Sequence, residues 1–252
     1  MRTSISKVVA VAFLFVMAPF AENAFPSEEI HWSYNGPGGP ENWGDIKSEF
    51  STCKTGERQS PIDITIGEKV DLHGIHVDYK PARLDIVNNG HTIQVNYSEG
   101  SFIEINGKRY NLLQFHFHSP SEHKVSGKDF PLEAHLVHKG EEGLAVIGVF
   151  LTEGKENTFL KDVWKHLPKK GGDKHALDEV KIDTSKFLPE DRSYVHYYGS
   201  LTTPPCSEGV KWMVLNQTIE VSKAQIEQFR QIIHGNARPV QPHKGRIIEA
   251  KK

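Results

Sequence analysis

The feature that most constrains this chain is an alternating run at residues 114–118, with the sequence QFHFH. Successive side chains of a β-strand point to opposite faces, so the run predicts a strand with His116 and His118 on one face and two phenylalanines on the other. A third histidine, His135, lies in a second strand-like run at 132–137. Two adjacent strands of this kind can place three imidazoles around one metal ion and leave a fourth position open. Three protein ligands and one open position are typical of catalytic zinc sites.

Two polar residues favour a metal site over ordinary surface histidines. Gln114 lies two residues from His116 on its strand, and Glu133 lies two residues from His135, so each is expected to share a face with its histidine. Metal-bound imidazoles normally give their second N–H to such acceptors, which fixes the orientation of the ring. We therefore predict Gln114 and Glu133 as the hydrogen-bond partners of the metal ligands.

A competing motif uses the same histidines. The spacing His116-x-His118-x3-Glu122 matches the metal-binding run of cupin barrels, in which Glu122 would itself be a ligand. That fold also requires a Pro-x-Gly turn before its last histidine and an asparagine after it. His135 lies in EAHLVHK, which has neither feature, so the cupin interpretation is disfavoured.

Short β-prone runs separated by turn signals dominate the rest of the chain. Asn-Gly pairs at 89–90 and 106–107 lie between such runs and indicate hairpins. Helical patterns are few, and one of them follows the capping residue Ser222. The expected strands are 84–87, 91–97, 102–105, 114–118, 132–137 and 143–151, the last buried on both faces, and the expected helices are 158–166 and 223–233. The sequence thus predicts a mainly β, single domain with short helices at its margins.

The first 24 residues differ from the rest. Arg2 and Lys7 precede a short apolar run at 8–20, and the small residues Ala21 and Ala24 follow it. This order is typical of a signal peptide, because a membrane span needs about 20 apolar residues; an uncleaved anchor is the alternative. We expect cleavage near 21–24, a single domain at 25–252, and export to the periplasm or else to the medium.

Export makes the two cysteines, Cys53 and Cys206, informative. An oxidising compartment favours their pairing, and two buried free thiols are the alternative. Because the bridge would close a long loop, the chain-entropy model assigns it about 5 kcal/mol of stabilisation.

The chain resembles an α-class carbonic anhydrase of the exported bacterial type. The matching motifs, in chain order, are HWSY at 31–34, QSPIDI at 59–64, NNGH at 88–91, QFHFH at 114–118, SEH at 121–123, EAHLVH at 133–138, SLTTPP at 200–205 and RPVQP at 238–242. The resemblance implies a large, twisted, mostly antiparallel central sheet. It also implies reversible hydration of carbon dioxide to bicarbonate and a proton by hydroxide on one Zn²⁺ per chain, held by His116, His118 and His135.

The resemblance further assigns roles around the metal. The Thr202 hydroxyl would donate to Glu122, since an ionised carboxylate only accepts, and would therefore accept from the attacking hydroxide. His91 corresponds to the proton shuttle, a role that suits a side chain titrating near neutral pH. The remaining implied residues are Tyr34, Asn89 and Gln94 for the water of the proton path, Thr203 for contact with bicarbonate or inhibitors, and Val137, Val146, Leu201 and Trp212 for an apolar wall facing carbon dioxide. Ordinary core packing is the alternative for each wall residue.

The resemblance also yields three finer expectations. By similarity, the second N–H of His118 should meet a backbone carbonyl near residues 244–246. Ser60-Pro61 and Pro204-Pro205 are candidate cis peptide bonds. The segment SPSE at 119–122 replaces a longer aromatic and glycine-rich link of animal members and is expected to change the rim of the site, leaving its ligands unchanged.

Two functional classes remain at this point. One is a zinc lyase, and the other is a non-catalytic binding protein on the same fold. Binding proteins of that kind typically lose a zinc-binding histidine, whereas all three are present here, so the enzyme is favoured. The expected partners are CO2 and bicarbonate, with sulfonamide- or anion-type inhibitors. The near balance of 30 Lys+Arg against 32 Asp+Glu argues against nucleic acid, and a homodimer is left open.

Overall fold

The computed structural model describes residues 31–65 and 67–251. The expected signal peptide at 1–24 therefore lies outside the described residues. Within them, no helix is both long and apolar enough to cross a membrane.

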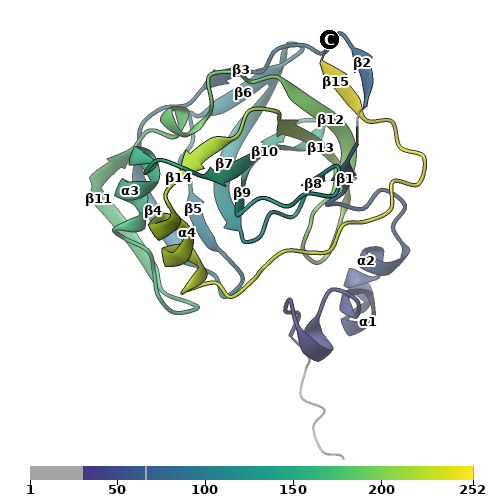
Figure 1. Cartoon of the computed structure of the whole chain (residues 1–252), viewed down its shortest axis with the longest axis horizontal. Helices are drawn as coiled ribbons and strands as arrows, with labels where there is room; N and C mark the ends of the chain where they lie inside the picture. The colour runs from purple at the N-terminus through teal and green to yellow at the C-terminus, as the bar shows by residue number, and fades with distance from the viewer. Residues whose placement is uncertain (1–30, 66, 252) are drawn as a thin grey trace, which may run out of the picture.

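Strands far apart in the sequence hydrogen-bond into one large sheet that runs through the molecule (Figure 1). Its order along the main path is β11-β4-β5-β7-β9-β10-β13-β12-β15-β2, and most neighbouring pairs are antiparallel. The strands are β1 (Asp63–Ile64), β2 (Glu68–Val70), β3 (His76–Asp78), β4 (Ala82–Asn88), β5 (Ile93–Asn96), β6 (Phe102–Ile105), β7 (Lys108–His118), β8 (Lys124–Val125), β9 (Leu132–Gly140), β10 (Gly143–Glu153), β11 (Lys174–Ile182), β12 (Tyr194–Ser200), β13 (Glu208–Leu215), β14 (Ile219–Val221) and β15 (Glu249–Lys251). The predicted fold class is confirmed.

Helices are short and lie outside the sheet. They are α1 (Trp43–Ile46), α2 (Thr52–Thr55), α3 (Thr158–Trp164) and α4 (Lys223–Arg230), with 3-10 turns at Gly36–Gly38, Ser48–Phe50 and Thr184–Phe187. Both predicted helices exist, but they end before the predicted residues 166 and 233, because the chain turns after the last residue of α3 and of α4. The predicted strand 91–97 is also shorter, since residues 89–92 form a turn before β5.

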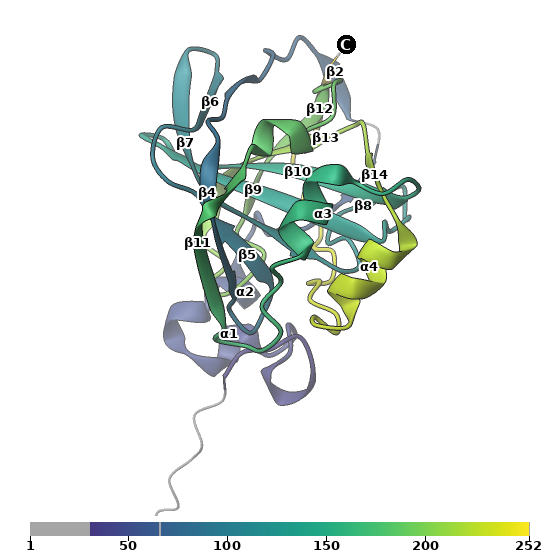
Figure 2. The same cartoon turned by 90° about the vertical axis from the view of Figure 1, so that its left-hand side faces the viewer.

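The two faces of β7 have different surroundings. Phe115 and Phe117 are fully buried in the larger core, where Phe117 packs edge-on against Trp164 of α3 and against Phe229 of α4. Helices α3 and α4 lie together on this side of the sheet in both views (Figures 1 and 2). Burying each phenylalanine contributes about 1.5–3 kcal/mol, so these contacts fix which face of β7 is left for the histidines.

Strand register then sets the histidines side by side. His116 of β7 lies directly opposite His135 of β9, and Gln94 of β5 lies opposite His116 on its other side. Cross-strand neighbours on one face have Cβ atoms roughly 4.5–5.5 Å apart, so the site is assembled by three adjacent central strands.

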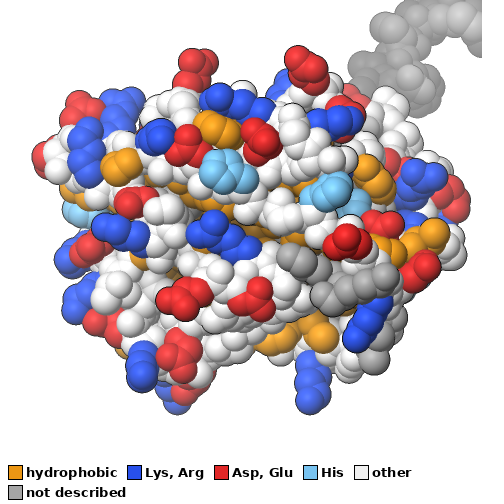
Figure 3. Space-filling model, turned by 90° about the horizontal axis from the view of Figure 1, so that it is seen from above, with side chains coloured by type: hydrophobic (Ala, Val, Ile, Leu, Met, Phe, Trp, Pro, Cys, Tyr) orange, Lys and Arg blue, Asp and Glu red, His pale blue; other side chains and the backbone are white. Residues whose placement is uncertain are grey.

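The surface seen in Figure 3 carries acidic and basic side chains interspersed, without a broad area of one sign. The mixture of signs on that face agrees with the near balance of charges in the composition.

Candidate metal centre

His116, His118 and His135 meet on the face of the sheet opposite the larger core. One nitrogen from each ring lies within 4.8 Å of one nitrogen of the other two. His118 and His135 are each 1 % exposed, whereas His116 is partly exposed and opens the group to one side. The structure thus brings together the three histidines predicted as ligands.

The second nitrogen of each ring is held by an acceptor. His116 Nδ1 lies 2.9 Å from Gln114 Oε1, and His135 Nε2 lies 2.8 Å from Glu133 Oε1. His118 Nδ1 lies 2.7 Å from the carbonyl oxygen of Asn236. Because these nitrogens are committed as donors, Nε2 of His116, Nε2 of His118 and Nδ1 of His135 are left to bind a metal.

The three inward nitrogens fit a zinc ion. His118 Nε2 is buried without a hydrogen-bond partner among the described residues. Burying such a nitrogen is unfavourable unless it gains a partner, and a bound metal ion would be one. Burial lowers the pKa of His118, and burial together with the neighbouring imidazoles lowers the pKa of His116 well below its usual value, so both rings offer neutral lone pairs. For His135, burial lowers the pKa, but the attraction and hydrogen bond of Glu133 outweigh burial and leave the pKa raised.

The partner of His118 corrects one prediction. The carbonyl belongs to Asn236, and the predicted segment 244–246 lies elsewhere, with Lys244 paired to Glu57 and Arg246 bonded to the carbonyl of Tyr198. The reason is that residues 234–238 run beside the end of β7. The backbone N–H of Asn236 donates to the carbonyl of Ser119, and its side-chain Oδ1 accepts from the N–H of Ser119.

Glu133 is fully occupied by hydrogen bonds. Its Oε1 accepts from His135 and from His123, each at 2.8 Å, and its Oε2 accepts from the backbone N–H groups of Glu122 and His123 at 2.9 Å. Burial raises the pKa of Glu133, but His123 and His135 outweigh burial and hold that pKa well below its usual range. The carboxylate is therefore ionised and acts only as an acceptor. Sequence reasoning missed His123, although it lies in the SEH motif beside Glu122.

Glu122 lies next to the ligands. Its Oε1 accepts from the backbone N–H of Arg238 at 2.9 Å, and its Oε2 is 3.4 Å from His118 Nε2. Thr202 is only 5 % exposed, yet no hydrogen bond in the described part of the chain joins its hydroxyl to Glu122. The Thr202–Glu122 interaction therefore stays a prediction, and Arg238 is a partner of Glu122 that sequence reasoning did not find.

A cavity of about 130 Å³ lies between the candidate ligands and His91. Its lining contains the residues predicted for the proton path together with two candidate ligands: Trp32, Tyr34, Asn89, His91, Thr92, Gln94, Gln114, His116, His118 and Thr203. The ring of His91 stacks on Trp32, with centroids 3.6 Å apart. Burial, and then the nearby His31, lower the pKa of His91. Asn89 Oδ1 accepts from the N–H groups of His91 and Thr92, so Asn89 shapes the loop that presents His91.

Three of the predicted wall residues are cross-strand neighbours. Val146 of β10 lies opposite Val137 of β9 on one side and Trp212 of β13 on the other. The Trp212 ring packs edge-on against His135 at 4.8 Å, and Leu201 packs against the same apolar cluster. These four residues are not among those lining the cavity next to His91, so the predicted apolar wall is not part of that cavity.

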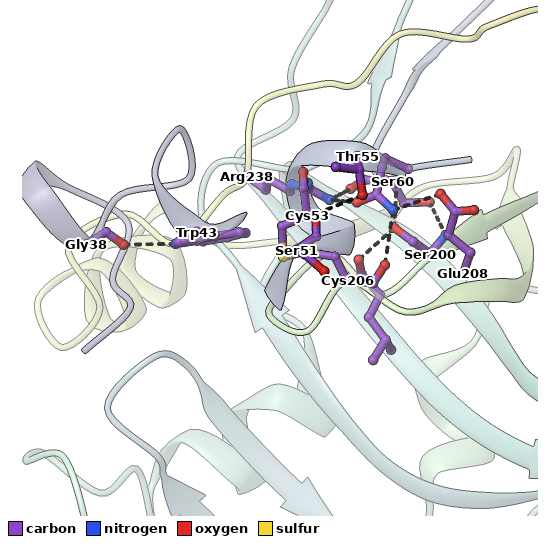
Figure 4. Close-up of a disulfide and its surroundings, with 12 residues drawn as sticks. Gly38, Trp43, Ser51, Cys53, Thr55, Ser60, Ser200, Cys206, Glu208 and Arg238 are labelled. Carbon is purple, nitrogen blue, oxygen red and sulfur yellow. Dashed lines mark hydrogen bonds between the residues drawn. A yellow bond between two sulfur atoms is a disulfide. The ribbon is translucent and has the colours of Figure 1, made fainter. Parts of the chain in front are cut away.

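The two cysteines form a disulfide, as predicted, with an S–S distance of 2.08 Å. It joins α2 to the loop after Thr203, where the backbone N–H of Cys206 donates to the Thr203 carbonyl. Figure 4 shows Arg238 beside this bridge; its guanidinium donates to Cys53 and Ser60 carbonyls and to Gln59 Oε1. Both predicted cis peptide bonds are present, and Ser119-Pro120 is a third that was not predicted.

Comparison with known proteins agrees with this architecture. The model of the family "Eukaryotic-type carbonic anhydrase" matches residues 38–252. A carbonic anhydrase of Nostoc sp. is 43 % identical over 228 residues, covering 88 % of this chain and 86 % of that protein, and one of Neisseria gonorrhoeae is 45 % identical over 221 residues, covering 86 % and 87 %. The structure of the α-carbonic anhydrase of Thermovibrio ammonificans with the inhibitor sulfanilamide superposes with a TM-score of 0.85 at 48 % identity, covering 87 % of this chain and 98 % of that one.

The chain belongs to the eukaryotic-type, or alpha, carbonic anhydrase family. The protein is therefore a carbonic anhydrase, as the sequence predicted, and the cupin interpretation is excluded. The family depends on zinc, and the histidine cluster supplies candidate ligands.

Proposed function

We propose that the protein catalyses reversible hydration of carbon dioxide on one zinc ion per chain, held by His116, His118 and His135. The observation that carries this proposal is that the two nitrogens of each imidazole ring have different surroundings. One nitrogen is bonded to an acceptor outside the site, and the other is turned toward a common point, with His118 Nε2 buried and unpartnered among the described residues.

The ion supplies a hydroxide nucleophile at neutral pH, because zinc lowers the pKa of bound water to about 7, a value known from carbonic anhydrases themselves. The chain supplies orientation. Glu122 is held by Arg238 through Oε1, which leaves Oε2 to accept from the Thr202 hydroxyl. Thr202 then has only its acceptor lone pairs to offer a proton-bearing nucleophile, and this selects a lone pair directed at the substrate carbon.

The cavity between the ligands and His91 supports a role for His91 in carrying the proton away. Its lowered pKa keeps the ring neutral near pH 7 and able to accept a proton. Tyr34 and Gln94 line the same cavity and would order the water that bridges the distance. Outside that cavity, the apolar surface of Val137, Val146, Leu201 and Trp212 suits a nonpolar substrate.

Inhibitor binding and export are further parts of the proposal. The Thermovibrio ammonificans relative is described in complex with sulfanilamide, so we expect primary sulfonamides to bind at the same place here. The Cys53–Cys206 disulfide supports an exported protein, because structural disulfides persist in oxidising compartments.

Replacing His116 tests the ligand assignment. His116→Ala should lower zinc content well below one ion per chain and abolish CO2 hydration, since loss of a partner of a ligand already costs about 10–100-fold in affinity or activity. Zinc is measured by elemental analysis and hydration by stopped flow. His175→Ala is the matched control, because His175 is an exposed histidine on edge strand β11. Full zinc and full activity in His116→Ala would refute the assignment, whereas zinc without hydration in the wild type would favour a binding protein.

A further inference from the structure

A buried chain of hydrogen bonds leads away from the candidate ligand His135 to the loop that carries Thr202. It passes from Glu133 to His123 at 2.8 Å, from His123 Nε2 to the Tyr197 hydroxyl at 2.6 Å, and from Tyr197 to Ser60 Oγ at 2.8 Å. It ends where the backbone N–H of Ser200 donates to Ser60 Oγ at 3.1 Å. All of these side chains are at most 1 % exposed.

The chemistry of the partners sets one direction for the whole chain. Because the Glu133 carboxylate only accepts, His123 donates from Nδ1. At the other end, the Ser200 N–H only donates, so the proton of the Ser60 hydroxyl points to Tyr197. The Tyr197 hydroxyl must then donate to His123. The Ser60 hydroxyl donates in turn to Tyr197 and accepts from Ser200. Each donor therefore has one acceptor, and reversing one bond would require reversing its neighbours.

The far end of the chain is fastened to the backbone before Thr202. Ser200 Oγ accepts from the N–H of Ser60 at 2.9 Å and donates to the carbonyl of Leu201 at 2.7 Å. Gly199 makes this approach feasible, because a Cβ there would lie 2.1 Å from Ser60 Oγ and 2.7 Å from the Tyr197 ring. The same set of bonds thus reaches both a candidate zinc ligand and the loop above it.

We propose that Tyr197 and His123 are positioning residues for the metal centre: through Glu133 they fix the ring of His135, and through Ser60 they fix the backbone leading to Thr202. The proposal rests on the ligand set of the proposed function. Glu133 Oε1 is shared by two imidazole N–H groups, so His123 pins the carboxylate that orients His135. Without the Tyr197 donor, His123 Nε2 would be buried and unsatisfied, and the ring would be free to turn away from Glu133.

The chain contains a matched pair that allows a sharp control. The Tyr79 hydroxyl lies 2.7 Å from His138 Nε2, and both side chains are buried, as in the Tyr197–His123 pair. His138 Nδ1 faces the carbonyl of Ala145, and neither residue bonds to Glu133 or to a candidate ligand. Tyr79→Phe and Tyr197→Phe therefore remove the same kind of bond, and only the second removes it from the chain that reaches His135.

The experiment measures how fast the zinc-loaded proteins release zinc to excess chelator. Tyr197→Phe should release zinc about three- to tenfold faster than the wild type, somewhat less than the 10–100-fold effect of a direct partner of a ligand. Tyr79→Phe should release zinc at the wild-type rate, although both variants lose comparable thermal stability in the metal-free form. Equal release rates in Tyr197→Phe and Tyr79→Phe would overturn the proposal.

A wild-type measurement keeps the test decisive if Tyr197→Phe does not fold. Nitrogen-15 NMR of labelled histidines should show His123 protonated at Nδ1 and bare at Nε2, and a proton on Nε2 would contradict the direction of the chain. Failure of the ligand set on which the proposal rests would look different, because the wild type would then hold no zinc at all.

Discussion

At the scale of the residue, each candidate ligand is defined by the partner of its second nitrogen. Gln114 and Glu133 were predictable because a side chain two residues away on a strand must share a face with its histidine. Asn236 was not, since it contacts His118 through a backbone carbonyl, which any residue type supplies, and lies 118 positions along the chain. His123 and Arg238 were missed for a related reason: their contacts with Glu133 and Glu122 depend on how the loops fold back.

His91 carries the first prediction at this scale. His91→Ala should lower kcat for CO2 hydration in weak buffer by about tenfold or more, because a positioned proton acceptor contributes roughly 10²–10⁴-fold to steps limited by proton transfer. Added imidazole should restore much of the loss. The wild-type kcat should rise with pH through a pKa below the ordinary histidine value, because burial and His31 lower the pKa of His91 and only the neutral ring accepts a proton.

Two observations would contradict that role. One is an unchanged kcat in His91→Ala in weak buffer, and the other is a loss that imidazole does not restore. His175→Ala serves again as the control for removing an exposed histidine.

At the scale of the element, the alternating pattern predicted the second half of β7, which carries His116 and His118, but not its first half. Tyr110 and Leu112 face the same large core as Phe115 and Phe117, although strict alternation would place them on the histidine face. The register shifts between Leu112 and Gln114, and Leu113 is 42 % exposed at that point. Such a bulge moves every later side chain to the other face, so it keeps both halves of the strand in contact with the core.

Helix α4 is predicted to depend on its N-terminal cap. The Ser222 hydroxyl accepts from the N–H of Gln225, and Gln225 Oε1 accepts from the N–H of Ser222. Ser222→Ala should lower the free energy of unfolding by about 1 kcal/mol. In a protein of this size that loss corresponds to roughly 2–4 °C in Tm, measured by calorimetry. Ser222→Thr should keep most of the stability, and an equal loss in both variants would show that the hydroxyl is not what matters.

At the scale of the whole molecule, the disulfide joins the N-terminal helices to the loop beside the site. Because the bridge spans 153 residues, it restricts the unfolded chain strongly. Replacing both Cys53 and Cys206 by serine should lower the free energy of unfolding by about 2–5 kcal/mol, measured by denaturant titration. Intact mass of the protein without reductant should be lower than the reduced mass by two hydrogen atoms. Two free thiols in that protein would contradict the bridge.

The sheet shows which parts of the fold could be predicted from the sequence. Strands β4, β5, β6, β9, β10 and the end of β7 were predicted from alternation, an apolar run and Asn-Gly turns, and β6 agrees with its prediction at both ends, whereas β11, β12 and β13 of the same sheet were not predicted. The order of the strands in the sheet could not be predicted from the sequence. The parallel pairing of β10 with β13, for example, depends on how the residues between these two strands fold. The ligand set was accessible because its members lie on two neighbouring antiparallel strands, whereas the chain from Tyr197 to Ser60 crosses 137 positions.

Zinc content and CO2 hydration, followed together in the wild type, give the sharpest test of zinc-dependent catalysis. Zinc is removed stepwise with a chelator and then added back, and the hydration rate is measured at each occupancy. We predict that the rate falls in proportion to bound zinc, that hydrolysis of an activated ester falls with it, and that both return fully at one zinc per chain. Hydration that persists in the metal-free protein, or its absence from the fully loaded protein, would contradict a zinc-dependent mechanism.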